Sequence, residues 1–280
     1  MPVNNHKDKH GIAIVANDKV FHWLLPFLES YRATNSGLPL HLIPFDNNVA
    51  ATRRAAERYG AIWVDDEMAE LDALARRLYP FFPQHRRRLR KLQALALPLD
   101  QVIYVDVDTI LFRDFRNLFG KLRPAEADFV IASTSEDYVY NRRRGEHAFL
   151  SGATLFNDGF FLTSRNILSL ADIQRVIDAD EDLFHEVRKR GMLFAQPLVN
   201  FVVHRLGLKL LTLADCVPNA SNESFYKAEG VRLSENGPLD WEGREIYFAH
   251  WAGAVGRPKR RIFDSLWQEY AQRARIRMAV

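Results

Sequence analysis

The chain has 280 residues, of which 48% are hydrophobic, enough for a sizeable core in one large α/β domain. Thirty-eight basic residues nearly balance thirty-five acidic ones, and a formal net charge of +3 lacks the excess that a nucleic-acid-binding protein would need. The single cysteine, Cys216, rules out an intramolecular disulfide, and no apolar run is long enough to span a bilayer.

The start of the chain and its cysteine content bear on its location. Residues 1–10 are polar and lack the apolar core of a secretory signal, and a lone cysteine fits a reducing compartment. Basic residues gather at 86–91, 142–144 and 257–261, which either are solvated faces or attract anions such as a nucleotide diphosphate or lipid head groups. We therefore expect a cytoplasmic protein that is able to bind peripherally at the inner face of a membrane.

Strand-like and helix-like segments alternate through the first half of the chain. The pattern predicts, in order, a strand at 11–16, a helix at 20–34, a strand at 39–45, a helix at 49–59, a strand at 61–64, a helix that starts at 65–67, a basic helix at 86–97 and a strand at 101–105. Gly60 is placed to end the second of these helices.

The second half continues the alternation less regularly. We expect strands at 128–132, 154–163, 209–213 and 246–249, helices at 173–190 and 197–206, and an amphipathic basic helix at 263–278. The arginine-rich stretch 138–147 is the best candidate for a mobile loop, which either contacts the acceptor or is simply solvated. This order of elements predicts an α/β fold with a mixed, mainly parallel sheet flanked by helices, whose ligands lie at the carboxyl ends of the strands.

The strongest chemical signal is Asp106-Val107-Asp108, which directly follows the expected strand 101–105. Strand alternation lets the two carboxylates point the same way, and two such carboxylates repel unless a cation lies between them. Hard oxygen ligands suit Mg²⁺ or Mn²⁺, with substrate phosphates completing the coordination. An isolated Asp-X-Asp also ends many strands as a simple turn, so the surrounding sequence has to decide.

The context of the two aspartates resembles the family-8 glycosyltransferases of the glycogenin and bacterial lipooligosaccharide galactosyltransferase type, and related nucleotide-diphospho-sugar transferases. In these families a helix with a basic residue, a Leu-Pro turn and a hydrophobic strand precede the metal-binding Asp-X-Asp, as residues 91–114 do here. Further similar segments follow in the right order over residues 11–262: the first strand ending in Ala-Asn-Asp, Phe-Asn-Asp-Gly at 156–159, Gln-Pro-Leu-Val-Asn at 196–200, and His-Trp-Ala-Gly at 250–253.

This resemblance implies a GT-A fold and a role for each matching residue. It implies nucleoside contacts at the end of the first strand, donor-sugar contacts in the Phe-Asn-x-Gly segment, and diphosphate contacts after the late histidine. The implied metal ligands are Asp106, Asp108 and His250, and the implied catalytic set is Asp106, Asp108 and Gln196. The implied donor-binding residues are Ala16, Asn17, Asp18, Lys91, Asn157, Gly159, Gly253 and Arg257.

Two departures from the family pattern bear on mechanism. The family's aspartate before Gln196 is Ala195 here, which bears on acceptor binding and on the details of the reaction. The family's lysine before the late proline is Arg257, one position further along the chain.

The expected activity is transfer of a sugar from a nucleoside-diphosphate donor, taken as a UDP-sugar, to a glycan, lipid-linked or small-molecule acceptor. The resemblance implies retention of the anomeric configuration. A histidine ligand beside two carboxylates favours Mn²⁺ over Mg²⁺. We expect a single domain over 1–280, with a donor half at 10–133, an acceptor half at 134–262 and the C-terminal helix at 263–280.

Two other functions stay open at this point. A nucleotidyltransferase shares the sheet and the metal chemistry, but it usually has a glycine-rich basic loop where this chain has Ala16-Asn17-Asp18-Lys19. A catalytically degenerate module that only binds a nucleotide-sugar is favoured by Ala195 and disfavoured by the intact Asp106, Asp108 and His250.

Overall fold

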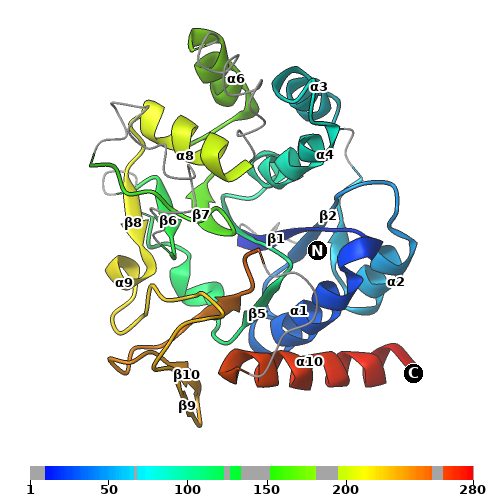
Figure 1. Ribbon diagram of the computed structural model, residues 1–280, viewed down its shortest axis with the longest axis vertical. Coiled ribbons are helices and arrows are strands. Elements are labelled where there is room, and N and C mark those ends of the chain that lie inside the picture. Colours follow the sequence, from blue (N-terminus) through cyan, green and yellow to red (C-terminus); the bar gives the residue numbers. More distant parts are fainter. Residues whose placement is uncertain are drawn as a thin grey trace, which may run out of the picture.

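A seven-stranded mixed sheet forms the centre of the molecule (Figure 1). The computed structural model describes residues 10–65, 68–122, 127–133, 152–180, 195–253 and 261–279. The strand order is β3-β2-β1-β4-β7-β6-β8. The strands are β1 (His10–Ala16), β2 (Leu40–Pro44), β3 (Ile62–Trp63), β4 (Gln101–Val105), β6 (Phe129–Ile131), β7 (Phe160–Ser164) and β8 (Leu210–Thr212).

The sheet is mainly parallel, as the sequence predicts. Strands β3, β2, β1 and β4 run parallel, β7 is antiparallel to both of its neighbours, and β6 and β8 pair in parallel. The carboxyl ends of β1 and β4 therefore lie at the same edge, which is where ligands bind in sheets of this kind.

Each face of the sheet carries its own hydrophobic core. Alternate residues of a strand point to opposite faces, so that Ile103 and Val105 belong to one core while Val102 and Tyr104 belong to the other. The first core is covered by α1 (Phe21–Thr34), α2 (Ala50–Arg58) and α10 (Ile262–Ala279), and the second by α3 (Ala69–Leu78), the 3₁₀ helix η2 (Arg87–Ala96), α6 (Leu170–Ala179) and α8 (Ala195–Arg205).

Smaller elements complete the described part of the fold. Four are 3₁₀ or α-helical turns, and four are short strands outside the main sheet. They are η1 (Asp18–Val20), α4 (Pro83–Arg86), η3 (Phe115–Leu118), α9 (Leu213–Cys216), β5 (Thr109–Leu111) paired with β11 (Phe248–His250), and β9 (Arg232–Ser234) paired with β10 (Gly237–Leu239).

Several element boundaries differ from those predicted. The continuous helix expected at 86–97 is instead the short α4 followed by η2, which ends before the extended Leu97. The strand expected at 154–163 is confined to β7, because the Phe156–Gly159 segment forms a polar turn. The helix expected at 173–190 begins earlier, at a capping box between Ser169 and Asp172, and its second half lies outside the described residues.

The C-terminal helix α10 packs along α1 (Figure 1). Its apolar residues Phe263, Trp267 and Ala271 are buried in the core beneath it. This buried stripe explains the amphipathic pattern of 263–278, because those side chains stabilise the protein itself. No helix within the described ranges is long and apolar enough to cross a membrane.

Candidate functional site

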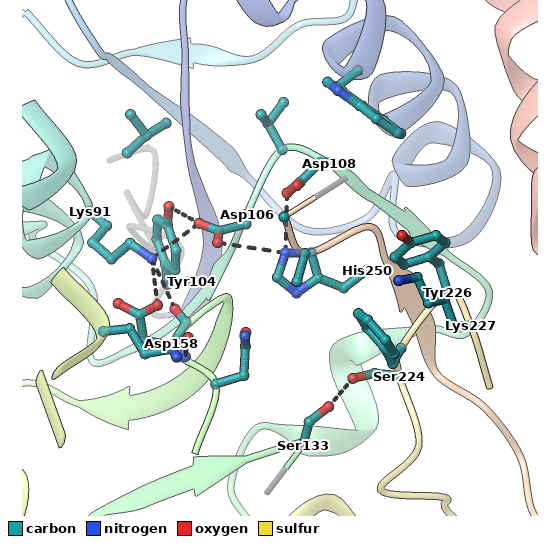
Figure 2. A pocket seen from close by; sticks show the side chains of 18 of the residues that line it. Lys91, Tyr104, Asp106, Asp108, Ser133, Asp158, Ser224, Tyr226, Lys227 and His250 are labelled. Carbon is teal, nitrogen blue, oxygen red and sulfur yellow. Dashed lines mark hydrogen bonds and ion pairs between the residues drawn. The ribbon is translucent and has the colours of Figure 1, made fainter. Parts of the chain in front are cut away.

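The Asp-X-Asp motif and the late histidine meet at the carboxyl end of β4. Asp106 and Asp108 lie in the connection from β4 to β5, and the antiparallel pairing of β11 with β5 sets His250 opposite Thr109. The His250 Nε2 atom lies 3.2 Å from Asp108 Oδ1 and 3.7 Å from Asp106 Oδ2 (Figure 2). The late strand β11 thus brings His250 next to the two aspartates.

These three side chains fit a divalent cation. Each offers one ligand atom, and the three atoms lie within 4.8 Å of one another. Burial alone would lower the pKa of His250, but the Asp108 and Asp106 carboxylates outweigh it and raise that pKa above its ordinary value. The imidazole can thus carry a proton that balances the two acids, and a bound cation would take the place of that charge.

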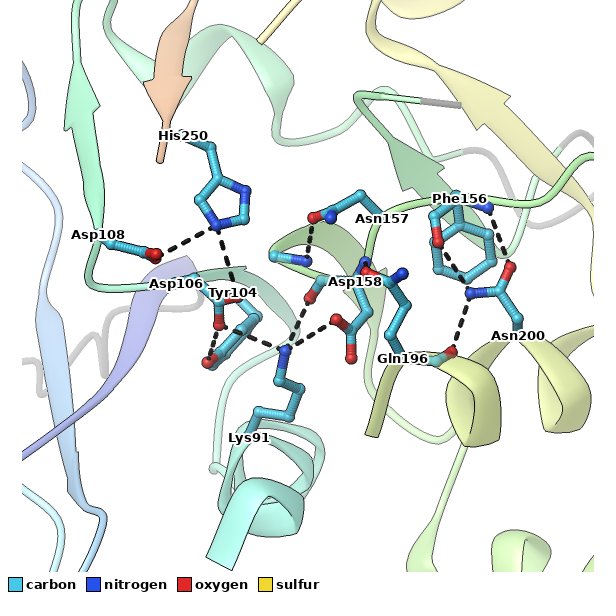
Figure 3. A network of polar contacts seen from close by, with 11 residues as sticks. Lys91, Tyr104, Asp106, Asp108, Phe156, Asn157, Asp158, Gln196, Asn200 and His250 are labelled. Atoms are coloured by element: carbon cyan, nitrogen blue, oxygen red, sulfur yellow. Dashed lines mark hydrogen bonds and ion pairs between the residues drawn. The ribbon is translucent and has the colours of Figure 1, made fainter. Parts of the chain in front are cut away.

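The Asp106 carboxylate is oriented by its neighbours. Burial would raise its pKa, but Lys91 and His250 hold that pKa below the ordinary value. The Tyr104 hydroxyl donates to Asp106 Oδ1 at 2.6 Å, and Lys91 Nζ lies 3.3 Å from the same oxygen (Figure 3). The other oxygen, Oδ2, therefore faces His250.

Lys91 pairs with a second acid that the sequence reasoning did not select. Its Nζ lies 3.0 Å from Asp158 Oδ1, and it donates to the Asp158 backbone oxygen at 3.3 Å (Figure 3). Asp158 is buried, and burial raises the pKa of its carboxyl group although Lys91 opposes that shift. In the sequence, the only sign of this role is that Asp158 occupies the variable position of the Phe-Asn-x-Gly segment, where the family pattern requires no charged residue.

The Asn157–Gly159 turn lies directly against the His250 side chain. The Gly159 backbone N–H donates to Asn157 Oδ1 at 2.8 Å, and the Asp106 N–H donates to the Gly159 carbonyl at 2.8 Å. A Cβ atom at Gly159 would lie 2.7 Å from His250 Nδ1 and 2.8 Å from Asn157 Oδ1. Only glycine lets the imidazole rest against this turn.

Helix α8 is tied to the same turn through Asn200. Its side-chain amide accepts a hydrogen bond from the Phe156 N–H at 2.9 Å and donates to the Phe156 carbonyl at 2.8 Å (Figure 3). One turn earlier in α8, Gln196 Oε1 accepts a bond from the Asp158 N–H at 3.4 Å. Asn200 is fully buried, so its part in the Gln-x-x-x-Asn pattern is to hold the turn.

A cavity of about 1240 Å³ opens over these residues. Most of the site residues predicted from the sequence line this one cavity. Its walls include Ala16, Asn17, Lys91, Asp106, Asp108, Asn157, Gln196, His250 and Gly253, and also Ala195 and Asp158.

Asp18 has a different position from the one expected. Its carboxylate accepts hydrogen bonds from the Ala51 N–H at 3.1 Å, and from the Thr52 N–H and hydroxyl at 2.8 Å each. These bonds cap the start of α2, and Asp18 is not among the residues that line the cavity. The neighbouring Asn17, in contrast, is buried at the cavity wall, where its amide donates to Asp46 at 2.9 Å.

A second wall of the cavity comes from residues 221–229 and 240–244, which lie in the predicted acceptor half but include none of the site residues predicted from the sequence. The first of these segments is fixed to β11, because the His250 N–H donates to the Ser224 carbonyl at 2.7 Å and the Tyr226 N–H donates to the His250 carbonyl at 3.1 Å. Lys227 follows directly, with its Nζ 5.3 Å from the centre of the Tyr226 ring (Figure 2).

Some of the expected site residues cannot be placed. Arg257, the rest of the basic loop up to residue 260, and the arginine-rich stretch 138–147 lie outside the described residues.

Comparison with known proteins rests on structure. No protein-family model and no curated protein sequence matches the chain. The galactosyltransferase LgtC, solved as an active-site mutant, superimposes with a TM-score of 0.59 at 15% identity over 94% of this chain and 95% of its own. The bifunctional glycosyltransferase WbbM gives 0.58 at 11% identity over 99% of this chain and 53% of its own. The glycosyltransferase GlyE of Streptococcus pneumoniae TIGR4 gives 0.54 at 15% identity over 95% and 60%. This chain therefore has the GT-A glycosyltransferase fold.

Proposed function

We propose that the protein is a metal-dependent glycosyltransferase, which moves a sugar from a nucleoside-diphosphate donor to an acceptor hydroxyl. The observation that carries the proposal is the convergence of Asp106, Asp108 and His250 at the carboxyl edge of a GT-A sheet. LgtC, which shares the fold, has been solved in complex with donor and acceptor sugar analogues, and this supports the same pair of substrates here.

Asp106, Asp108 and His250 would hold the metal ion, and Tyr104 and Lys91 keep Asp106 in its orientation. When bound there, the ion would supply a positive charge that stabilises the departing diphosphate. We assign Asn17 to the nucleoside and Asn157 with Gln196 to the transferred sugar and the acceptor, since all three line the cavity.

The diphosphate needs cationic partners beyond the metal ion. We assign this role to Arg257 and, among the described cavity residues, to Lys227, and we assign to Gly253 a hydrogen bond from its backbone N–H to the same diphosphate. Lys227 rests over the Phe225 and Tyr226 rings at 5.7 and 5.3 Å and forms no ion pair with a described carboxylate. Its charge is therefore available to a phosphate group.

The finer points follow from the resemblance and from ligand chemistry. We propose Mn²⁺ in preference to Mg²⁺ because one ligand is an imidazole nitrogen. We propose a UDP-sugar as donor and retention of configuration, by a front-face route in which the donor phosphate assists the incoming hydroxyl. We propose a single domain whose donor half is 10–133, in a cytoplasmic protein whose membrane contact, if it forms, uses basic loops rather than the buried stripe of α10.

One experiment tests the proposal directly. Hydrolysis of a panel of nucleotide-sugars is measured with Mn²⁺, with Mg²⁺ and with excess chelator. The proposal predicts metal-dependent hydrolysis of at least one donor, and loss of most of it in Asp108→Asn with the fold retained by circular dichroism. Full activity in excess chelator would contradict the metal-dependent reaction.

The second candidate function is a module that binds a nucleotide-sugar without turnover. It is favoured by Ala195, which presents a methyl group to the cavity where the family pattern has an aspartate. Metal-dependent binding of a donor by calorimetry, with no hydrolysis and no transfer, would identify this function. The nucleotidyltransferase alternative would instead show pyrophosphate release from a nucleoside triphosphate and a sugar phosphate.

A further inference from the structure

An exposed tryptophan stands in the wall of the cavity. Five large hydrophobic side chains are exposed in the described part of the chain: Ile62, Phe81, Leu233, Trp241 and Ile276. Of these five, Trp241 alone lines the cavity, and 69% of its surface is accessible to solvent. An indole exposed to water lacks the stabilisation that burial would bring. Its position in the cavity wall therefore points to a ligand that covers it.

The turn that carries Trp241 is rigid. The preceding Asp240 is buried, and its carboxylate accepts hydrogen bonds from the N–H groups of Glu242 and Arg244 at 2.9 Å each and from the Ser221 hydroxyl at 2.6 Å. The Trp241 Cβ packs on Gly230, where an added methyl would come within 2.9 Å of it. The backbone and Cβ of Trp241 are therefore held in place before any ligand arrives, which lowers the entropic cost of binding.

Polar side chains accompany the indole along the same wall. Asn222, Glu223 and Arg244 line the cavity with Trp241 and offer both hydrogen-bond donors and acceptors. A flat apolar ring beside such groups matches a pyranose, which has an apolar C–H face and a rim of hydroxyls. The same wall is joined to the metal-ligand strand through the Ser224 and Tyr226 backbone bonds to His250.

The size of the cavity leaves room for two ligands. Pockets for one small molecule are usually about 300–1,000 Å³, and this cavity measures about 1240 Å³. A nucleotide-sugar that reaches from Asn17 to Asn157 past the metal ligands and Lys227 would leave another part of the wall free for a second ligand. That part consists of Asn222, Glu223, Trp241 and Arg244.

We propose that Trp241 is the stacking platform of the acceptor subsite, and that the acceptor presents a saccharide ring to it. The acceptor role of this subsite rests on the proposed function. The saccharide site itself is defined by Trp241 and its polar neighbours. The proposed acceptor is thus a compound that carries a sugar unit.

The test reads saccharide binding without any donor. The Trp241 indole N–H resonance is assigned by its absence in Trp241→Phe, and it is followed as methyl glucoside, methyl galactoside, methyl N-acetylglucosaminide, lactose, maltose and cellobiose are added at millimolar concentrations. The inference predicts that at least one probe shifts this resonance. It further predicts that Trp241→Ala weakens the binding of that probe by about tenfold or more, while Trp241→Phe retains part of it.

The matched control is Leu233→Ala, which removes another exposed hydrophobic side chain, from β9, outside the cavity wall. It should bind the probe as the wild type does. The inference is overturned if no probe shifts the Trp241 resonance, or if Trp241→Ala binds as tightly as the wild type. Donor hydrolysis by the wild type, measured in parallel, decides the proposed function separately, because saccharide binding does not depend on it.

Discussion

The absence of a side chain at Gly159 allows His250, the proposed metal ligand, to take its position. The imidazole of His250 lies against the Asn157–Gly159 turn, and a Cβ at position 159 would collide with it. We expect Gly159→Ala to displace His250 and to weaken Mn²⁺ affinity by about tenfold or more, the cost of one misplaced ligand. Isothermal calorimetry with Mn²⁺ measures this effect.

A second glycine variant serves as the control. In Gly37→Ala the added methyl meets only the end of the flexible Arg116 side chain, at 3.2 Å. Gly37 is distant from the candidate site in the sequence, and the added methyl meets none of the site residues. Its Mn²⁺ affinity should match the wild type. Unchanged affinity in Gly159→Ala would mean that His250 is not a ligand.

Lys227 is the second residue whose role can be tested alone. Its ammonium group lies over two aromatic rings at the cavity wall, without a described carboxylate partner. We expect Lys227→Gln to weaken UDP binding in the presence of Mn²⁺ by about tenfold, since a charge-assisted hydrogen bond to phosphate would be lost. Uridine, which has no phosphate, should bind the variant and the wild type alike. Equal loss for UDP and uridine would instead indicate a disturbed pocket.

At the scale of elements, Glu29 joins three helices on one face of the sheet. It is a buried residue of α1 that accepts hydrogen bonds from Tyr59, at the end of α2, and from Arg277 of α10, with Arg32 completing the network. Burial alone would raise the pKa of Glu29, but these partners outweigh it and hold the pKa below its ordinary value of 4.5.

A lowered pKa in the folded state means that the ionised form stabilises the fold. This contribution is complete above pH 4.5 and is lost as the pH falls through the lower folded-state pKa. We expect Glu29→Gln to reduce the free energy of unfolding by about 1–3 kcal/mol at neutral pH and by less in acid. Urea denaturation across the pH range measures it. The exposed Glu57→Gln, whose partner Arg53 lies 3.9 Å away, should change stability by less than about 1 kcal/mol at any pH.

For the whole molecule, the balance of charge at the site links metal binding to stability. Asp106, Asp108 and Asp158 gather around Lys91 and His250, so that the folded protein keeps acidic groups close together. A ligand that binds only the folded state stabilises it by about 2.7 kcal/mol at a hundred times its dissociation constant.

For a chain of this length, each kcal/mol of added stability raises the melting temperature by an amount near the lower end of roughly 2–4 °C. We therefore expect Mn²⁺ to raise the melting temperature by a few degrees. Differential scanning calorimetry with Mn²⁺, and then with excess chelator, should show the rise and its reversal. Asp108→Asn should show neither. A melting temperature that ignores Mn²⁺ in the wild type would argue against a metal site.

The sequence by itself determined what depends on local pattern. Hydrophobic runs and turn residues locate β1, β2 and β4, and the position of two aspartates directly after β4 predicts acids at the sheet edge. The ordered motifs were enough to predict the fold. Boundaries failed where local pattern is ambiguous, as in the 3₁₀ helix η2, whose residues have helical spacing but whose exit toward Leu97 and Pro98 is extended.

Only the tertiary structure decided which distant residues share a space. The pairing of Lys91 with Asp158 spans 67 residues of sequence, and no local rule predicts it. Asp18 and Asn17 are adjacent, yet one caps α2 and the other lines the cavity. The wall that carries Trp241 and Lys227 reaches the metal ligands through backbone bonds to His250. Such contacts depend on the register of β11 against β5 and on helix packing, and these are fixed by the complete core rather than by any one segment.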